Sequence, residues 1–485
     1  MDSLQTLELG ARPSGRTLLT SDWLLGYRDG GHVLIRNGEL VLEGGRVIFA
    51  GPRFAGPVTR RIALGAALIS PGLIDLDALS DLDTYTLVLD NQPGWQKGRI
   101  PPANYLPYEM YSPAELAFQK KFSFATLLLN GITTALPIAS LYYREWAETV
   151  AEFDAAADAA TELGLRVFLG PAYRSGGTVV DEAGAFHPRF DEARGLQGLA
   201  DAVAFIRRRS GGLIQGLLAP DRVETCTATL LQRTMDHARE LDCPVRLHMA
   251  QGRMETEMMA GLHGTTGPQW LAGQGLLTPR LIAPHATHAT DRDVALYAEH
   301  GVSVAHSPLV SARMGGMLAS FARFRACGIN IGMATDTAPP DMWMNMLVGL
   351  IACRIADGDP AATGSAEMFD AATLGGAKAL ARDDLGRLAP GACADVAIFR
   401  LDDPRMTPTV DPITTLVLGG NGAVTQAVFV DGRLSMRDGR VAGLDLPAAR
   451  RQAQAQFEGL VAKYPDRSWQ HPPVAEIFRP TFPIL

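Results

Sequence analysis

The chain has 485 residues, an apolar fraction of 47% and a net charge of −8 at pH 7. This length favours about two structural units, and the negative charge excludes the basic surface that binds nucleic acids or anionic membranes. Five cysteines without a Cys-x-x-Cys pair argue against a disulfide framework, and the lack of a signal core or of about 18 consecutive apolar residues predicts a cytoplasmic protein.

The N-terminal part, residues 1–69, is typical of short antiparallel strands. Residues 33–36, 39–42 and 46–49 are strand-like. The dipeptides Asn37-Gly38 and Gly44-Gly45 separate them and favour tight hairpin turns.

The middle of the chain, residues 70–382, alternates short apolar runs with amphipathic stretches. This alternation predicts βα units and a parallel sheet. Eight strands favour a (β/α)8 TIM barrel, and a doubly wound open sheet is the alternative, although no Gly-rich dinucleotide motif follows the first strand. The predicted strands are 72–77, 132–137, 165–171, 213–219, 244–249, 281–285, 302–306 and 330–335. The predicted helices are 146–163, 199–209, 225–241 and 291–300.

Residues 383–445 return to a strand-and-turn pattern. Strands are predicted at 394–399, 424–430 and 433–436, with turns at Asp431-Gly432 and Asp438-Gly439. The last part, residues 446–485, contains a predicted helix at 446–464 and a tail rich in proline and aromatic residues. We expect this tail to dock on its own domain or on a sister subunit, because it is apolar.

Three polar residues each follow an apolar strand of the predicted barrel. They are His248, His285 and Asp336. Chemistry in such barrels takes place where the strands end, at the C-terminal face. A single histidine after a strand is more often a hydrogen-bonded loop residue than a ligand, so the motifs around these residues decide their interpretation.

Residues 70–79 read Ser-Pro-Gly-Leu-Ile-Asp-Leu-Asp-Ala-Leu. This segment resembles the Pro-Gly-(apolar)-Ile-Asp-x-His-x-His motif of the amidohydrolase superfamily, with Asp77 and Leu79 in the two histidine positions, so that the metal site is degenerate. Three further matches follow in the family's order: His-Met-Ala-Gln from His248, His-Ala-Thr-His from His285, and Gly-Met-Ala-Thr-Asp-Thr around Asp336. The resemblance is strongest to the triazine, guanine and cytosine deaminase and chlorohydrolase-like branch.

This resemblance implies a barrel beside a composite β-sandwich, which residues 1–69 and 383–445 build from the two chain ends. In typical members a metal-bound water attacks the substrate. Carried over by position, His248 and Asp336 would be metal ligands, and His285 would stabilise the oxyanion. Gln251 stands where the family has the glutamate that protonates substrate and leaving group.

Each departure from the family pattern has a chemical consequence. Leu79 cannot bind a metal, and Asp77 in place of a histidine shifts the preference towards harder ions. Gln251 has no titratable proton. We therefore expect a metal-free polar pocket rather than the standard site. A divalent metal (zinc, iron or manganese), if present, would be held by Asp77, His248 and Asp336. The alternative is that Asp77 belongs to a solvated acidic loop.

Candidate substrate-binding residues are Trp95, Arg174 and His306. Trp95 lies with Tyr105, Tyr108 and Tyr111 in a long segment after the first strand, which is either a lid or a loop packed on the barrel. Arg174 follows the third strand and could hold a substrate carboxylate or phosphate.

The catalytic candidates are His285, Asp336 and Gln251, and they favour an enzyme. We predict an amidohydrolase-like hydrolase that acts on a C–N or related bond of a small heterocycle or cyclic amide, with the standard metal-hydroxide mechanism in doubt. The alternatives are a non-catalytic binding protein with the amidohydrolase fold and a metal-free enzyme that catalyses a non-hydrolytic reaction. The expected partners are a small-molecule substrate and further copies of the chain, as a homodimer or higher homo-oligomer, with neither nucleic acid nor membrane.

Overall fold

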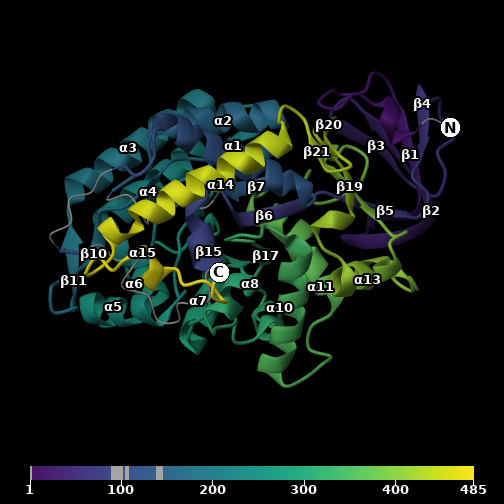
Figure 1. Ribbon diagram of the computed structural model, residues 1–485. Coiled ribbons are helices and arrows are strands. Elements are labelled where there is room, and N and C mark those ends of the chain that lie inside the picture. Colours follow the sequence, from purple (N-terminus) through teal and green to yellow (C-terminus); the bar gives the residue numbers. More distant parts are fainter. Residues whose placement is uncertain (1–2, 89–101, 104–108, 138–145, 485) are drawn as a thin grey trace.

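The computed structural model describes residues 3–88, 102–103, 109–137 and 146–484. An α/β region of parallel strands and helices lies beside a predominantly β region that contains the N-terminus (Figure 1). The predicted α/β class is therefore confirmed.

Two four-stranded parallel sheets form the centre of the α/β region. The first has the order β12-β8-β7-β6 and the second the order β14-β15-β16-β17. The strands are β6 (Leu73–Ala78), β7 (Ile132–Pro137), β8 (Arg166–Leu169), β12 (Ile214–Gly216), β14 (Val245–Arg246), β15 (Leu281–Pro284), β16 (Ser303–His306) and β17 (Ile331–Met333). Each lies within or within one residue of a predicted strand.

The two sheets meet along both of their edges. Leu218, after β12, pairs in parallel with Val245 on β14. At the other edge the backbone N–H of Asp336, after β17, donates to the carbonyl of Asp77 on β6 at 2.7 Å. A short pair of strands, β9 (Ala172–Tyr173) and β13 (Ala219–Pro220), continues β8 and β12.

Helices follow the strands and cover them. They are α1 (Pro113–Leu129), α2 (Val150–Leu163), α3 (Glu192–Arg209), α4 (Ala228–Leu241), α5 (Arg253–His263), α6 (Gly267–Gly273), α7 (Asp291–His300), α8 (Pro308–Arg313), α9 (Phe321–Ala326), α10 (Met342–Asp357), α11 (Ser365–Asp370) and α12 (Gly376–Ala379). Side-chain caps explain where two of them begin. Thr149 and Thr227 accept hydrogen bonds from Glu152 N and Leu230 N, so α2 and α4 start later than predicted.

Apolar side chains pack on both faces of the parallel strands. A large core joins the strands to the surrounding helices. A second cluster contains side chains from both four-stranded sheets, among them Leu76, Leu136, Phe168, Ile282 and Ala305. Because strand side chains alternate between faces, these two clusters lie on opposite sides of the strands.

The chain ends share one nine-stranded sheet of order β21-β20-β19-β18-β5-β1-β2-β3, with β4 paired to β1. Its strands are β1 (Thr17–Arg28), β2 (Gly31–Glu43), β3 (Arg46–Gly51), β4 (Arg60–Ala63), β5 (Ala67–Pro71), β18 (Val396–Arg400), β19 (Thr425–Val430), β20 (Arg433–Arg437) and β21 (Arg440–Val441). The turn at Asn37-Gly38 was predicted wrongly. Residues 31–43 form one continuous strand, because β2 pairs with β1 along both halves and absorbs the positive φ of Asn37 (50°).

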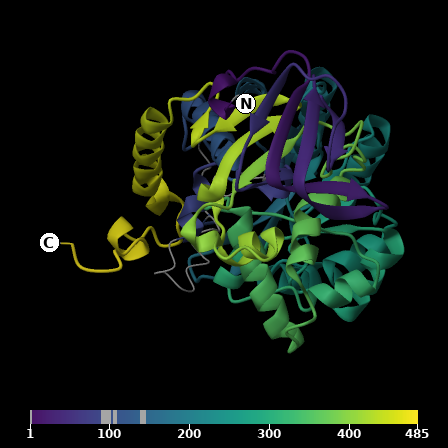
Figure 2. The same cartoon turned by 90° about the vertical axis from the view of Figure 1, so that its right-hand side faces the viewer.

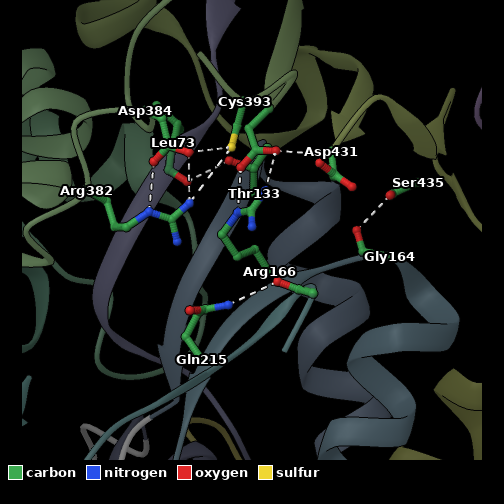
Figure 3. A network of polar contacts seen from close by, with 12 residues as sticks. Leu73, Thr133, Gly164, Arg166, Gln215, Arg382, Asp384, Cys393, Asp431 and Ser435 are labelled. Atoms are coloured by element: carbon green, nitrogen blue, oxygen red, sulfur yellow. Dashed lines mark hydrogen bonds and ion pairs between the residues drawn. The ribbon is translucent and has the colours of Figure 1, made fainter. Parts of the chain in front are cut away.

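A buried ion pair joins the nine-stranded sheet to the parallel strands. Arg166 on β8 donates from Nε and Nη2 to the carboxylate of Asp395 at 2.9 and 3.1 Å. Asp395 also accepts from the backbone N–H of Asp431 at 2.7 Å. Next to this pair, Asp384 accepts from the Cys393 thiol and from the Arg382 guanidinium (Figure 3). These contacts therefore connect residues from distant parts of the sequence at the N-terminal end of β8.

The C-terminal part docks on its own chain. Helix α14 (Leu446–Lys463) lies along α1, and α15 (Val474–Ile477) follows it (Figure 1). Leu460, Tyr464 and Ile477 form a buried cluster with Met110 and Leu116. The final residues extend away from the body (Figure 2), and Phe482 and Ile484 are exposed.

Further elements are the hairpin of β10 (Gly176–Val180) and β11 (Phe186–Phe190) and helix α13 (Pro412–Gly419), which buries Leu416 and Val417 in the large core. Among the described residues, none of the helices combines the length and the hydropathy that crossing a membrane requires.

Candidate functional site

Four buried polar residues lie at the C-terminal ends of the parallel strands. Asp77 is on β6, His248 follows β14, His285 follows β15 and Asp336 follows β17. Each is 4% exposed or less. Because parallel strands end at the same edge, residues that are far apart in the sequence meet here.

Asp77 is the centre of this group. Its Oδ2 lies 3.3 Å from His248 Nε2, and its Oδ1 lies 3.1 Å from Arg246 Nη1. Burial alone would raise the pKa of Asp77, but the electrostatic interactions with His248 and Arg246 outweigh burial and lower it. The Nδ1 of His248 lies 2.9 Å from the carbonyl oxygen of Asp221, which fixes the ring with Nε2 towards Asp77.

His285 and Asp336 form the other half of the group. His285 Nε2 lies 3.9 Å from Asp336 Oδ2, and the rings of His248 and His285 are 5.6 Å apart. Burial, together with the neighbouring His248, lowers the pKa of His285 to about 3, so its imidazole is neutral at pH 7. Burial and the carboxylates of Asp77 and Asp75 raise the pKa of Asp336 well above its usual range.

The backbone is strained where these strands end. Ala250, His285, Ala286 and Asp336 have φ values of 53°, 71°, 53° and 60°. Residues with a Cβ avoid this left-handed region, and such strain gathers at functional sites. Two of the four are the polar residues themselves, so this conformation sets the direction of their side chains.

Asp75 holds the segment before Asp336 in place. Its Oδ1 accepts from Thr335 N at 3.0 Å and its Oδ2 from Thr335 Oγ1 at 2.5 Å. Burial raises the pKa of Asp75 to about 7, although both bonds from Thr335 lower it. Asp75 therefore orients Asp336 through the backbone.

Gln251 lies beside the group, with its side chain already bonded. Arg222 Nη1 donates to Gln251 Oε1 at 2.5 Å. Glu255 accepts from the backbone N–H groups of Ala250 and Gln251 at 2.7 and 2.6 Å. Burial and the nearby Glu224 raise the pKa of Glu255 to about 7. Arg222 and Glu255 thus hold the loop that follows His248.

The three candidate substrate-binding residues have different surroundings. Trp95 lies outside the described residues, as do Tyr105 and Tyr108. The Arg174 guanidinium donates to Asp221 Oδ2 at 3.2 Å, behind His248. His306 is 1% exposed, with Nε2 at 3.8 Å from Cys353 Sγ and its ring against Phe321. Arg174 is next to the site because Asp221 also holds His248. His306 is next to it because it contributes to the lowered pKa of His285. Tyr111 donates its hydroxyl hydrogen to Asp83 and is buried in the α14 cluster.

Asp77, His248 and His285 could hold a metal ion. One ligand atom from each lies within 4.8 Å of the others. The Nε2 of His285 is buried without a hydrogen bond, which is costly unless another group satisfies it. The Asp77 oxygens are met only by the ion-pair contacts with Arg246 and His248, without a hydrogen bond. One carboxylate and two imidazoles suit zinc and other transition metals. The residues present therefore fit a divalent metal, with Asp336 beside them.

Arg246 was not singled out from the sequence. It is 1% exposed and donates from Nη1 to the carbonyls of Leu136 and Pro137 at 2.9 and 2.6 Å. The sequence pattern could have indicated it. Val245 and Leu247 pack in the large core between the strands and the helices, so strand alternation places Arg246 and His248 together on the other face of the strands.

The sequence matches the model of the Amidohydrolase family over residues 69–435. One relative, the 5-methylthioadenosine/S-adenosylhomocysteine deaminase of Desulforudis audaxviator, is 27% identical over 446 residues, which cover 87% of this chain and 95% of the relative. The enzyme of the same name from Nitratidesulfovibrio vulgaris (strain DP4) is 29% identical over 443 residues, which cover 87% of this chain and 92% of the relative.

Solved structures have the same fold. A zinc-bound adenosine deaminase from Xanthomonas campestris has a TM-score of 0.74 at 20% identity and covers 91% of this chain and 98% of its own. A variant of atrazine chlorohydrolase from Arthrobacter aurescens, complexed with zinc and atraton, has a TM-score of 0.76 at 22% identity and covers 91% and 100%. Two of these neighbours hold zinc, and this chain brings three ligands together. The prediction of a metal-free pocket therefore has no support.

Proposed function

The chain belongs to the amidohydrolase family and is a hydrolase that acts on a C–N bond of a small heterocycle. We propose that it removes the exocyclic amino group of an adenine-derived substrate. One observation carries the proposal: the metal-binding group and a separate carboxyl, Asp336, converge at the ends of the parallel strands. The named deaminases that match over 87% of the chain support the substrate class.

We also propose that the eight parallel strands close into a (β/α)8 barrel. The contacts at both edges and the inner apolar cluster with side chains from both sheets support closure. The nine-stranded sheet would then be the composite β-sandwich of residues 1–69 and 383–445, flanking the barrel of residues 70–382, with residues 446–485 as a C-terminal extension.

Asp77, His248 and His285 would hold one divalent metal, and zinc in two structural neighbours supports zinc as the ion. Asp336, predicted as a ligand, stands beside this set and completes it if its carboxylate turns inward. A bound divalent ion would lower the pKa of a water molecule and supply a nucleophile at neutral pH.

The other groups would handle charge and protons. Where Asp336 completes the metal site in place of His285, the neutral imidazole of His285 would orient the substrate and stabilise the charge that develops on the substrate ring. The charge of a bound divalent ion would offset the burial and the neighbouring carboxylates that raise the pKa of Asp336. Asp336 would then take the proton of the attacking water at Oδ2 and return it to the leaving amine, since Gln251 has no titratable proton. Gln251, held by Arg222, would instead hydrogen-bond a ring nitrogen of the substrate.

Three further residues are proposed to contribute to substrate binding. Trp95, Arg174 and His306 are proposed to shape or support the substrate site, with Arg174 acting through Asp221 and His248. A homodimer or higher homo-oligomer and a cytoplasmic location are likewise proposed.

A direct experiment measures ammonia release from adenosine, 5-methylthioadenosine and S-adenosylhomocysteine by the zinc-loaded full-length protein. We expect turnover with at least one of them, and a loss of about a hundredfold or more in kcat for Asp336→Asn. The matched control is Asp341→Asn, because Asp341 is a helix-capping carboxylate close by in the sequence and outside the site. Full activity in Asp336→Asn, or no turnover of any of these compounds, would contradict the proposal.

A further inference from the structure

A buried arginine shares Asp77 with the metal-binding residues. Arg246 is 1% exposed, and its Nη1 lies 3.1 Å from Asp77 Oδ1. The same nitrogen donates to the carbonyls of Leu136 and Pro137 on β7. These two carbonyls anchor the guanidinium, so it does not depend on Asp77 for its position.

This arrangement supplies a positive charge to a carboxylate that has no access to water. A buried carboxylate without a counter-charge is strongly unfavourable. In many metal sites the ion itself provides that charge. Here Arg246 provides it from within the chain, next to Oδ1, while Oδ2 faces His248.

We propose that Arg246 is a positioning residue that acts as the built-in counter-charge of Asp77 and thereby weakens and loosens the binding of the divalent metal. The inference rests on the proposed function in that it takes the ion to bind at Asp77, His248 and His285. The guanidinium restricts Asp77 to one oxygen for the metal, and its charge repels the ion. The fold then stays intact when the ion leaves, and the ion exchanges readily.

The test measures the affinity of the chelator-treated protein for Zn²⁺ by isothermal titration calorimetry. Arg246→Gln keeps a donor for the two carbonyls but removes the charge, and we expect it to bind Zn²⁺ at least about tenfold more tightly. Arg246→Lys keeps the charge and should stay within about threefold of the unmodified protein. The double variant Arg246→Gln/Asp77→Asn should lose the gain.

The matched control is Arg166→Gln, because Arg166 is equally buried and ion-paired, with Asp395, but is linked to the β-rich region rather than to Asp77. Its Zn²⁺ affinity should not change. As a second readout, Zn²⁺ should raise the Tm of Arg246→Gln more than that of the unmodified protein. If Arg246→Gln does not fold, Arg246→Met and Arg246→Lys give the same comparison of neutral with charged side chains.

Unchanged or weaker Zn²⁺ binding in the neutral variants, or equal tightening in Arg246→Lys, would overturn the proposal. These measurements do not use turnover. Tighter binding in a protein that deaminates nothing would therefore refute the proposed function and leave the role of Arg246 standing.

Discussion

At the scale of single residues, the site combines groups whose charge states are set by burial and by one another. Asp77 stays ionised beside His248 and Arg246, whereas Asp336, buried near two other carboxylates, has a raised pKa. Opposite shifts in neighbouring carboxyls are what acid–base chemistry at neutral pH requires.

Substitution of Gln251 tests which residue supplies the proton to the leaving amine. Gln251→Glu keeps the acceptor for Arg222 and adds a titratable carboxyl where a general acid contributes about 10²–10⁴-fold. We expect kcat for ammonia release to rise by about tenfold or more. Gln251→Met, which loses the bond to Arg222, should lower it. A Gln251→Glu protein with unchanged or reduced kcat would show that Asp336 alone supplies the proton.

His306 predicts a dependence of stability on pH. Burial lowers its pKa to about 4 from 6.5, so below pH 6.5 the unfolded chain takes up a proton that the folded protein does not. This residue therefore destabilises the fold as the pH falls from 6.5 to 4, by about 1.4 kcal/mol per pH unit.

Urea unfolding at pH 7.5 and pH 5 checks this effect. His306→Asn should lose less free energy of unfolding between these two values than the unmodified protein does. His187→Asn, at an exposed position, should lose as much as the unmodified protein. An identical loss in both variants would mean that His306 is solvated in the folded state.

At the scale of elements, the C-terminal helix shows which predictions extend to tertiary structure. The helix at 446–464 was predicted from its sequence pattern and is α14. Its docking against α1 and the segment before it depends on apolar residues such as Met110 and Leu116, hundreds of positions earlier. The pattern therefore predicted the helix and its apolar character, and only the packing identifies its partner.

Leu460 is the residue with which to test this packing. It is 1% exposed within the cluster around Met110 and Leu116, so Leu460→Ala should lower the free energy of unfolding by about 2–5 kcal/mol. Ile484→Ala, at a position that is 85% exposed, should have no measurable effect. Thermal or urea unfolding measures both, and equal effects would show that the helix is detached in solution.

At the scale of the whole molecule, the two regions depend on contacts between the chain ends and the parallel strands. β5 from the N-terminal part pairs with β18 from the C-terminal part, and Arg166 and Asp395 join this sheet to β8. We therefore expect the β-rich region and the parallel strands to unfold together.

Breaking the junction should destabilise the whole chain. Asp395→Ala leaves the buried Arg166 guanidinium without its partner, which costs about 3–5 kcal/mol. Glu240→Ala removes the exposed Arg207–Glu240 pair and should cost less than about 1 kcal/mol. Urea unfolding followed by fluorescence and circular dichroism measures both, and a small, local effect of Asp395→Ala would show that the two regions fold independently.

The sequence by itself determined the order of the strands, the family and the four residues Asp77, His248, His285 and Asp336. Strand periodicity and short motifs are local properties, so they can be recognised in the sequence alone. The turn predicted at Asn37-Gly38 was wrong, because pairing of β2 with β1 overrides the local preference for a turn. The two missing histidines of the motif favoured a metal-free pocket, because the motif does not show that His285 lies close to Asp77 and His248.

Only the tertiary structure decided which atoms meet. It placed His285 with Asp77 and His248, Arg246 against Asp77, and Arg222 on Gln251. These contacts depend on the register and the curvature of strands that are far apart in the sequence. A difference of one residue in register would turn Arg246 and His248 to the opposite face.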